Sequence, residues 1–238
     1  MTVIVPARQF ARMVHRTVAV VPDDPLEAPI LRCVHAWSDG THLLMEASDR
    51  RRLLRTRTAL ANADGDGLDA IIPARVLTAA CHLIPEPQPV AESDWEDDEA
   101  WISTVDPAKS WMVSLDVDGG QVHIAVRNDT TTSVTSTVRP RGEWPDLDRL
   151  WARIRPEVGD GPTAWTGTMA ADLLALAGDD VTTAPAIVWP SGSTHRPTVM
   201  TLGPDTIALL MPAVLDQECD PRDTWPGLLR DDREKADS

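Results

Sequence analysis

Arginine side chains form the clearest chemical pattern in this sequence. Arg8, Arg12 and Arg16 are spaced four residues apart, so in a helix they lie along one cationic stripe. The opposite side of that helix would carry Phe10, Met13, Val14 and Thr17. In a second helical stretch, Arg75, Thr78 and His82 share a polar face. Such stripes suit weak contacts with phosphate groups, although an ordinary solvated helix face has the same pattern.

Catalytic patterns are poor by comparison. The six histidines show no HExxH or paired HxH spacing, and the chain has neither a GxSxG elbow nor a GxxxxGK[ST] phosphate loop. The acidic run from Asp94 to Glu99 could bind a divalent cation weakly, but it is more typical of a solvated loop. We therefore expect no catalytic residues, no metal site and no cofactor; an enzyme that uses the acidic run with a metal is the weakest reading.

Composition limits the class of protein further. The 238 residues, 42% of them hydrophobic, suffice for one large or two small domains. A net charge of −15 argues against a protein that coats nucleic acid over its whole surface, so any DNA contact must be local. Three cysteines without CxxC spacing fit free thiols in a reducing cytoplasm. No apolar run approaches the roughly 20 residues that span a bilayer, so we expect a cytoplasmic protein without a membrane partner.

The order of predicted elements repeats. Each of two copies starts with a short strand, at Val3–Val5 and Ala70–Ile72, followed by Pro-Ala-Arg and a helix that ends near Val18 or Leu83. The strands expected after the first helix are 31–37, 42–47 and 53–58, and those after the second are 111–117, 122–127 and 131–138. Two similar halves about 65 residues apart indicate a duplicated unit. The Pro-rich, acidic stretch 85–109 between them is expected to be an irregular insertion.

A third, shorter unit follows. It is predicted to have a helix at 169–177, capped by Thr168 and ended by Gly178, and strands at 186–189, 198–202 and 206–211. This helix contains Asp172 and no Lys or Arg, so it would not attract phosphate. Residues 216–238 form a charged tail that we expect to be mobile, with an apolar island from Trp225 to Leu229 that could act as a self-ligand.

Three segments in this order resemble the bacterial DNA polymerase sliding clamp, the beta subunit of DNA polymerase III. They are Ala28-Pro29-Ile30-Leu31, Ser48-Asp49-Arg50-Arg51-Arg52-Leu53 and Leu209-Leu210-Met211-Pro212. Glu143 to Leu150 is similar to the connector between clamp domains, with Leu147 in place of an aromatic residue. The resemblance covers residues 3–215 apart from the acidic insertion. It best matches the middle clamp domain followed by half of the last one.

The resemblance implies an α+β fold of about three sliding-clamp repeats, each a short helix packed on antiparallel strands. The implied domains are 1–152 with two repeats and 153–215 with one repeat, before the tail 216–238. Arg8, Arg12, Arg16, Arg75 and His82 would face duplex DNA without reading its sequence. A groove for the short peptide motifs of polymerases and other clamp-binding proteins would comprise Leu31, Ser48, Arg50, Arg51, Arg52, Leu53, Pro145, Arg149, Leu150, Leu209, Leu210, Met211 and Pro212. We call these thirteen residues the docking-groove set; buried apolar members such as Leu53 and Leu209 are equally consistent with simple core positions.

Two functions follow from the resemblance. The first is a processivity factor that tethers DNA polymerase and other replication proteins to duplex DNA, and here a homo-oligomer would be required to close a ring. The second is a clamp-derived adaptor that binds clamp-interacting partners without encircling DNA.

The sequence departs from the clamp pattern in the proposed groove. Clamps usually have a small residue followed by a polar one where this chain has Arg50-Arg51.

Overall fold

The computed structural model describes residues 2–62, 66–91, 102–138, 140, 142–152, 154, 165, 167–178, 186–189, 191 and 196–212. The charged tail and the acidic run from Asp94 to Glu99 lie outside this part of the chain.

The two halves predicted from the sequence are present. The first consists of β1 (Thr2–Pro6), α1 (Ala7–Val18), the 3-10 helix η1 (Pro29–Arg32), β2 (Cys33–Asp39), β3 (His42–Ser48) and β4 (Arg52–Ala59). The second consists of β5 (Asp66–Pro73), α2 (Ala74–Cys81), β8 (Met112–Asp118), β9 (Gln121–Arg127) and β10 (Thr132–Val138). A proline in extended conformation, Pro6 or Pro73, precedes each helix, where its missing N–H costs no helical hydrogen bond.

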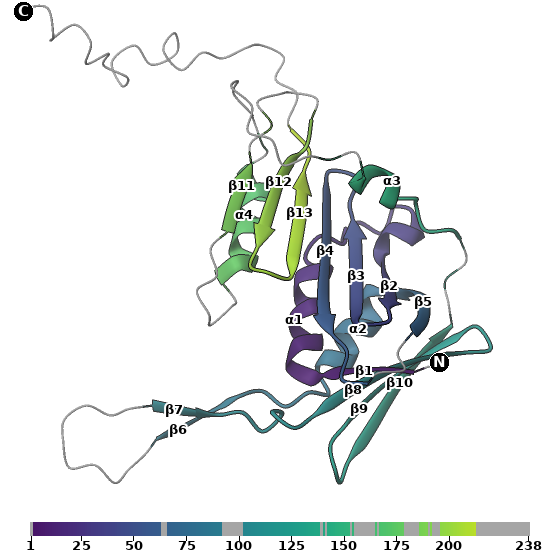
Figure 1. Ribbon diagram of the computed structural model, residues 1–238, viewed down its shortest axis with the longest axis vertical. Coiled ribbons are helices and arrows are strands. Elements are labelled where there is room, and N and C mark those ends of the chain that lie inside the picture. The colour runs from purple at the N-terminus through teal and green to yellow at the C-terminus, as the bar shows by residue number, and fades with distance from the viewer. Residues whose placement is uncertain are drawn as a thin grey trace, which may run out of the picture.

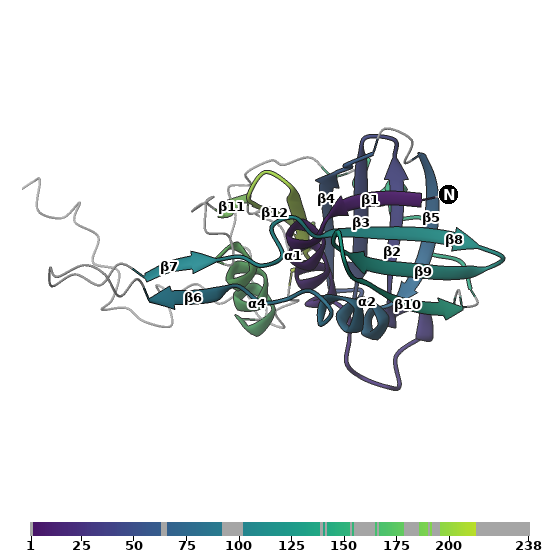
Figure 2. The same cartoon turned by 90° about the horizontal axis from the view of Figure 1, so that it is seen from below.

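The structure contradicts the predictions made for Leu31 and for the insertion. Leu31 belongs to η1 and not to a strand, because the segment that begins at Pro29 turns so that the Leu31 N–H donates to the Ala28 carbonyl. The insertion is not irregular at its ends, since β6 (Gln88–Ala91) pairs with β7 (Ile102–Val105). These two strands form an arm that projects away from the rest of the molecule (Figures 1 and 2).

The two halves exchange their first strands. β1 pairs with β8 of the second half, and β5 pairs with β2 of the first half. The result is a four-stranded sheet, β1-β8-β9-β10, and a larger sheet that contains β4-β3-β2-β5. Strands of the two sheets run across one another in Figure 2, with α1 and α2 side by side along one flank. Neither half can therefore complete its sheet without the other.

The third unit extends the larger sheet. It contains α4 (Gly167–Gly178), β11 (Ala186–Trp189), β12 (Thr198–Leu202) and β13 (Thr206–Leu210), and it follows the short helix α3 (Asp148–Trp151). β13 pairs antiparallel with β4, which gives one seven-stranded sheet of order β11-β12-β13-β4-β3-β2-β5 (Figure 1). We call this junction the seam, and residues 142–152, which contain α3, the connector.

A single apolar core crosses the seam. It includes Phe10 of α1, Leu54 of β4, Leu173 of α4 and Leu210 of β13, all of them fully buried. On α1 the buried residues include Phe10, Met13, Val14 and Thr17, as the helical spacing predicts. The third unit is thus packed on the first through side chains as well as through backbone hydrogen bonds.

Two turns depend on left-handed backbone conformations. The β8–β9 hairpin turns at Gly119 and Gly120, whose φ angles are +55° and +82°, values that glycine adopts without strain. In the β3–β4 turn, Arg50 has φ +72°, which is unfavourable for a residue with a side chain. The resemblance to clamps predicts a small residue near this position, and the arginine found here has a cost in backbone strain.

Truncation of Leu210 tests the shared core. We expect Leu210→Ala to lower the free energy of unfolding by about 2–5 kcal/mol, because it leaves a cavity under the seam. The matched control is Leu26→Ala, at a solvent-exposed leucine, which should change stability by less than about 0.5 kcal/mol. Urea denaturation followed by circular dichroism measures both, and equal effects of the two variants would contradict a core that crosses the seam.

Candidate docking site at the seam

The seven-stranded sheet has two different faces. Residues such as Leu54, Ala208 and Leu210 point toward the helices and the main core. The alternate residues, among them Glu46, Leu53, Arg55 and Leu209, point to the other face, where the connector lies. We call this second side the outer face, and it holds most of the side chains discussed below.

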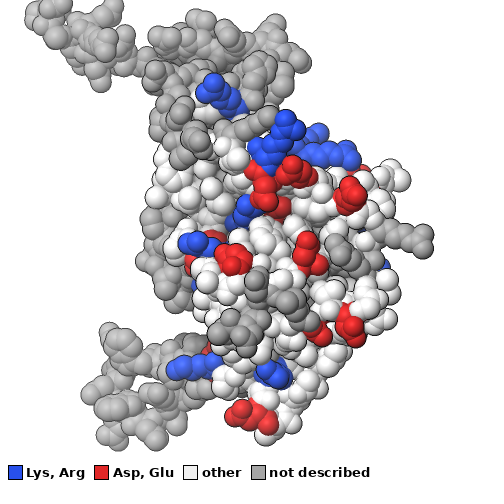
Figure 3. Space-filling view, turned by 45° about the vertical axis from the view of Figure 1, so that its right-hand side comes forward, with Lys and Arg blue, Asp and Glu red and all other residues white. Residues whose placement is uncertain are grey.

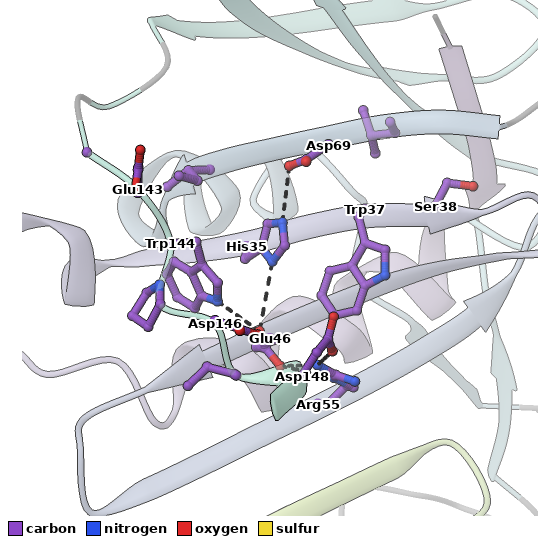
Figure 4. A pocket seen from close by; sticks show the side chains of 15 residues that line it. His35, Trp37, Ser38, Glu46, Arg55, Asp69, Glu143, Trp144, Asp146 and Asp148 are labelled. Carbon is purple, nitrogen blue, oxygen red and sulfur yellow. Dashed lines mark hydrogen bonds and ion pairs between the residues drawn. The ribbon is translucent and has the colours of Figure 1, made fainter. Parts of the chain in front are cut away.

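Glu46 of β3 is the central polar group of the outer face (Figure 4). Only 2% of its surface is exposed. The Trp144 Nε1–H donates to Oε1 at 2.8 Å and the Trp151 Nε1–H donates to Oε2 at 3.0 Å. Arg55 donates to the same Oε2 through Nε at 3.0 Å and Nη2 at 2.7 Å. One buried carboxylate therefore binds both tryptophans of the connector and one arginine of the sheet.

Planar side chains stack in a column across this carboxylate. The His35 ring lies 4.7 Å from Trp37 and 5.6 Å from Trp144, measured between centroids. The Arg55 guanidinium lies 4.9 Å from the Trp37 ring and 5.1 Å from the Trp151 ring. These contacts link Trp144, His35, Trp37, Arg55 and Trp151 in that order, so three side chains from the sheet lie between one connector tryptophan at each end. Cation–π contacts of this kind hold the arginine side chain in place.

A cavity of about 560 Å³ lies between this column and the connector. Its lining includes the carboxylates of Glu46, Asp69, Glu143, Asp146 and Asp148. The Asp69 carboxylate lies 3.1 Å from His35 Nε2. Asp148 forms an ion pair with Arg55, in which Oδ1 lies 2.7 Å from Nη2. Within the described part of the chain, no group of three His, Cys, Asp or Glu side chains is arranged to hold a metal ion.

The surroundings of Glu46 favour its charged form. Burial alone would raise the pKa of this carboxyl, but His35, the charge of Arg55 and the Trp151 N–H lower the pKa below its ordinary value. The His35 Nδ1–Glu46 Oε1 distance is 3.8 Å, which is longer than a hydrogen bond, whereas Arg55 and both indole N–H groups lie within hydrogen-bonding distance of the carboxylate.

The seam brings together part of the docking-groove set. Leu53 pairs directly with Leu209, and both are buried in a small cluster with Val199. Connector residues Leu147 and Trp151, together with Ile154, Trp189 and Ile207, pack against that cluster. Exposed apolar groups remain at Leu150 on α3 (38% exposed) and at Met211 (41% exposed), whose N–H donates to the Arg51 carbonyl.

Other members of the set lie elsewhere. Leu210 points to the opposite face and belongs to the main core, so its assignment to the groove is wrong. Leu31 is buried in η1 outside the seam cluster, and Pro145 lines the cavity beside Glu46. Pro212 directly follows Met211 and is half-buried.

The polar members of the set gather around the β3–β4 turn. Ser48 Oγ donates to the Arg52 carbonyl, and Arg52 bridges Asp49 and Asp172 of α4 at 2.8 and 3.0 Å. Arg50 pairs with Glu27, and the side chains of Arg51 and Arg149 are exposed. Figure 3 shows basic side chains gathered at the end of the molecule where this turn and α3 lie, with acidic ones next to them.

The residues predicted to face DNA have different environments. Arg12 of α1, Arg75 of α2 and His82, which directly follows α2, are exposed. Arg8 forms an ion pair with Asp106, and its Nε donates to the carboxylate at 2.9 Å. Arg16 is only 3% exposed and donates to Thr206 Oγ1 of β13 at 3.0 Å, so its assignment to a DNA-facing surface is wrong. The reason is the third unit, whose β13 covers the end of the predicted stripe.

Comparison with solved structures identifies the architecture. The DNA polymerase sliding clamp from Bacillus subtilis superimposes with a TM-score of 0.62 at 16% sequence identity, over 90% of this chain and 64% of that one. A putative DNA polymerase III beta subunit from Eubacterium rectale gives a TM-score of 0.64 at 11% identity, over 90% and 66% of the two chains. This chain has the sliding-clamp fold. A sliding clamp from Pseudomonas aeruginosa solved with a ligand agrees, at a TM-score of 0.62, 13% identity and coverage of 90% and 67%.

The likeness is one of fold and not of sequence. A scan of protein-family models and a search of curated proteins gave no match. The chain spans about two thirds of the length of the clamps that it resembles. No helix in the described part of this clamp fold is long and apolar enough to cross a membrane.

Sequence reasoning missed the Glu46 network. Two features of the sequence pointed to it. One is a glutamate between the apolar residues Met45 and Ala47 of a predicted strand, and the other is the pair of tryptophans on either side of the Pro-Asp segment of the connector. Neither feature predicts that the glutamate and the tryptophans are in contact, because Glu46 and Trp151 are 105 residues apart in the chain.

The lowered pKa of Glu46 predicts an acid-dependent loss of stability. An unfolded glutamate has a pKa of about 4.3, so the stabilisation is complete above that pH and is lost as pH falls through the folded value. We expect Glu46→Gln to cost about 3 kcal/mol at pH 7, and the difference from the unmodified protein should shrink below about pH 4. Denaturant titrations from pH 3 to 7 measure it, with Glu143→Gln on the exposed rim as control; a constant difference across this range would contradict the assignment.

Proposed function

We propose that this protein is a sliding-clamp-like processivity factor that tethers replication proteins to duplex DNA. The observation that carries the proposal is the seam, because pairing of β13 with β4 puts Leu53 and Leu209 side by side under the connector. A tether of this kind is a binding protein and not an enzyme. It acts by keeping its partner at high effective concentration near the template, so it needs no tight affinity for DNA.

The proposed partners are non-sequence-specific duplex DNA, a DNA polymerase and other proteins that carry clamp-binding motifs. Three repeats in one chain, in a domain of residues 1–152 and a half domain of residues 153–215, would need further copies of the chain to surround a duplex. DNA would meet the exposed residues Arg12 of α1, Arg75 of α2 and His82, which directly follows α2.

A second candidate is a clamp-derived adaptor that binds motif peptides without enclosing DNA. Two observations favour it. Of the arginines expected to face DNA, Arg16 is buried and Arg8 is held by Asp106. In addition, α4 has no Lys or Arg, and its Asp172 is paired with Arg52.

Retention on circular DNA separates the two functions. A processivity factor should stay on a closed circular plasmid in high salt and dissociate once the plasmid is linearised, whereas an adaptor should show equal, weak binding to both. We expect Arg12→Ala combined with Arg75→Ala to reduce the salt-dependence slope of DNA binding by about 2, since each lost phosphate contact removes roughly 0.9. Arg127→Ala, at an exposed arginine of β9, is the matched control and should leave the slope unchanged.

Binding of a motif peptide tests the groove. We expect a fluorescently labelled peptide with a Leu-Phe pair to bind, and Met211→Ala or Leu150→Ala to weaken it about tenfold, because a buried apolar contact at an interface is worth more than about 1 kcal/mol. Leu174→Ala is the control, since this α4 leucine is 42% exposed but lies away from the connector face. Fluorescence anisotropy measures the affinities; equal loss in all three variants would argue against a groove at the seam.

A further inference from the structure

The apolar centre of the proposed groove is occupied by the chain itself. Leu53, Val199 and Leu209 are all buried, and the side chains over them include Leu147 and Trp151 of the connector. An incoming leucine or phenylalanine would need the space that these connector side chains fill. In the structure described here, the centre of the groove is therefore closed.

Polar contacts fix the position of the connector over the cluster. Apolar packing alone is non-directional, so it does not specify where the connector lies. The indole N–H groups of Trp144 and Trp151, at the two ends of the connector, both donate to Glu46. Arg55, which also donates to Glu46, forms an ion pair with Asp148 between them. Three connector side chains are thus attached to one ion pair on the sheet, formed by Glu46 and Arg55.

The charge of Glu46 matters for the strength of this attachment. Hydrogen bonds to an ionised acceptor are roughly twice as strong as those between neutral groups. Trp151 links the two sites directly, because its N–H binds Glu46 while its ring packs against the cluster at Leu53 and Leu209. Movement of the ring off the cluster would strain or break the bond to the carboxylate.

We propose that the connector is a strap that holds the docking groove closed, and that Glu46 is the latch that keeps the strap in place. This inference rests on the proposed function, because it assigns regulation to the same groove. A peptide binds only to the open form, so its apparent affinity is reduced by the fraction of molecules that are open. Release of the latch raises that fraction and therefore raises the affinity.

Two variants weaken the latch in different ways. Glu46→Gln removes the negative charge, and Trp151→Phe removes the indole N–H and part of the ring system while it retains an aromatic ring against the cluster. We expect each variant to bind the Leu-Phe peptide at least about tenfold more tightly than the unmodified protein. The double variant should gain little more than either single variant, because both break the same contact. Unchanged or weaker peptide binding in both single variants would overturn the strap.

Thiol labelling tests the strap without any peptide. A cysteine introduced by Leu209→Cys lies under the connector, whereas one introduced by Leu210→Cys lies on the opposite face in the main core. With Cys219→Ser as background, we expect Glu46→Gln to speed maleimide labelling at position 209 about tenfold more than at position 210, where labelling reports unfolding of the main core. Burial raises the pKa of Cys81 to about 12 and also raises the pKa of Cys33, so both native thiols should react slowly.

The labelling result separates the possible failures. Greater acceleration at position 209 than at position 210, with no peptide binding in any variant, supports the strap and contradicts the proposed peptide groove. Equal acceleration at positions 209 and 210 means that Glu46→Gln loosens the whole core, and it overturns a local latch. No acceleration at position 209 overturns the latch as well.

Discussion

Antiparallel pairing of β13 with β4 is the interaction on which the rest of the molecule depends. It joins the third unit to the first through backbone hydrogen bonds, and its register decides which side chains meet on each face. On one face it places Leu209 beside Leu53, and on the other it adds Leu210 to the main core. A shift by one residue would exchange these faces and would destroy the groove and the core together.

The buried charge of Glu46 is the second constraint. A carboxylate with so little exposure is stable only when it is paired and hydrogen-bonded. Here the donors come from the sheet and from the connector, so the connector must lie close to β3 for the charge to be satisfied. The same requirement that stabilises Glu46 therefore determines where the connector, which forms the wall of the proposed groove, lies.

The third unit also changes the helix face that the sequence predicted to meet DNA. Arg16 continues the stripe of α1, yet Thr206 of β13 accepts its hydrogen bond and the guanidinium is withdrawn from solvent. Arg12 and Arg75 remain exposed on neighbouring helices. With a net charge of −15, and with Arg12 and Arg75 as the exposed arginines in the described residues of α1 and α2, this protein would bind DNA only weakly unless it encloses the duplex.

The sequence by itself determined the local elements and the repeat. The alternating buried residues of β9, the spacing of Phe10, Met13 and Val14, and the Pro-Ala-Arg helix starts depend on neighbours in the chain, so they can be read from the sequence. Only the tertiary structure decided the exchange of β1 and β5, the burial of Arg16 and the meeting of Glu46 with the connector tryptophans. These features join residues as far as 190 positions apart, and no local pattern specifies which of several compatible strands or donors will pair at such a distance.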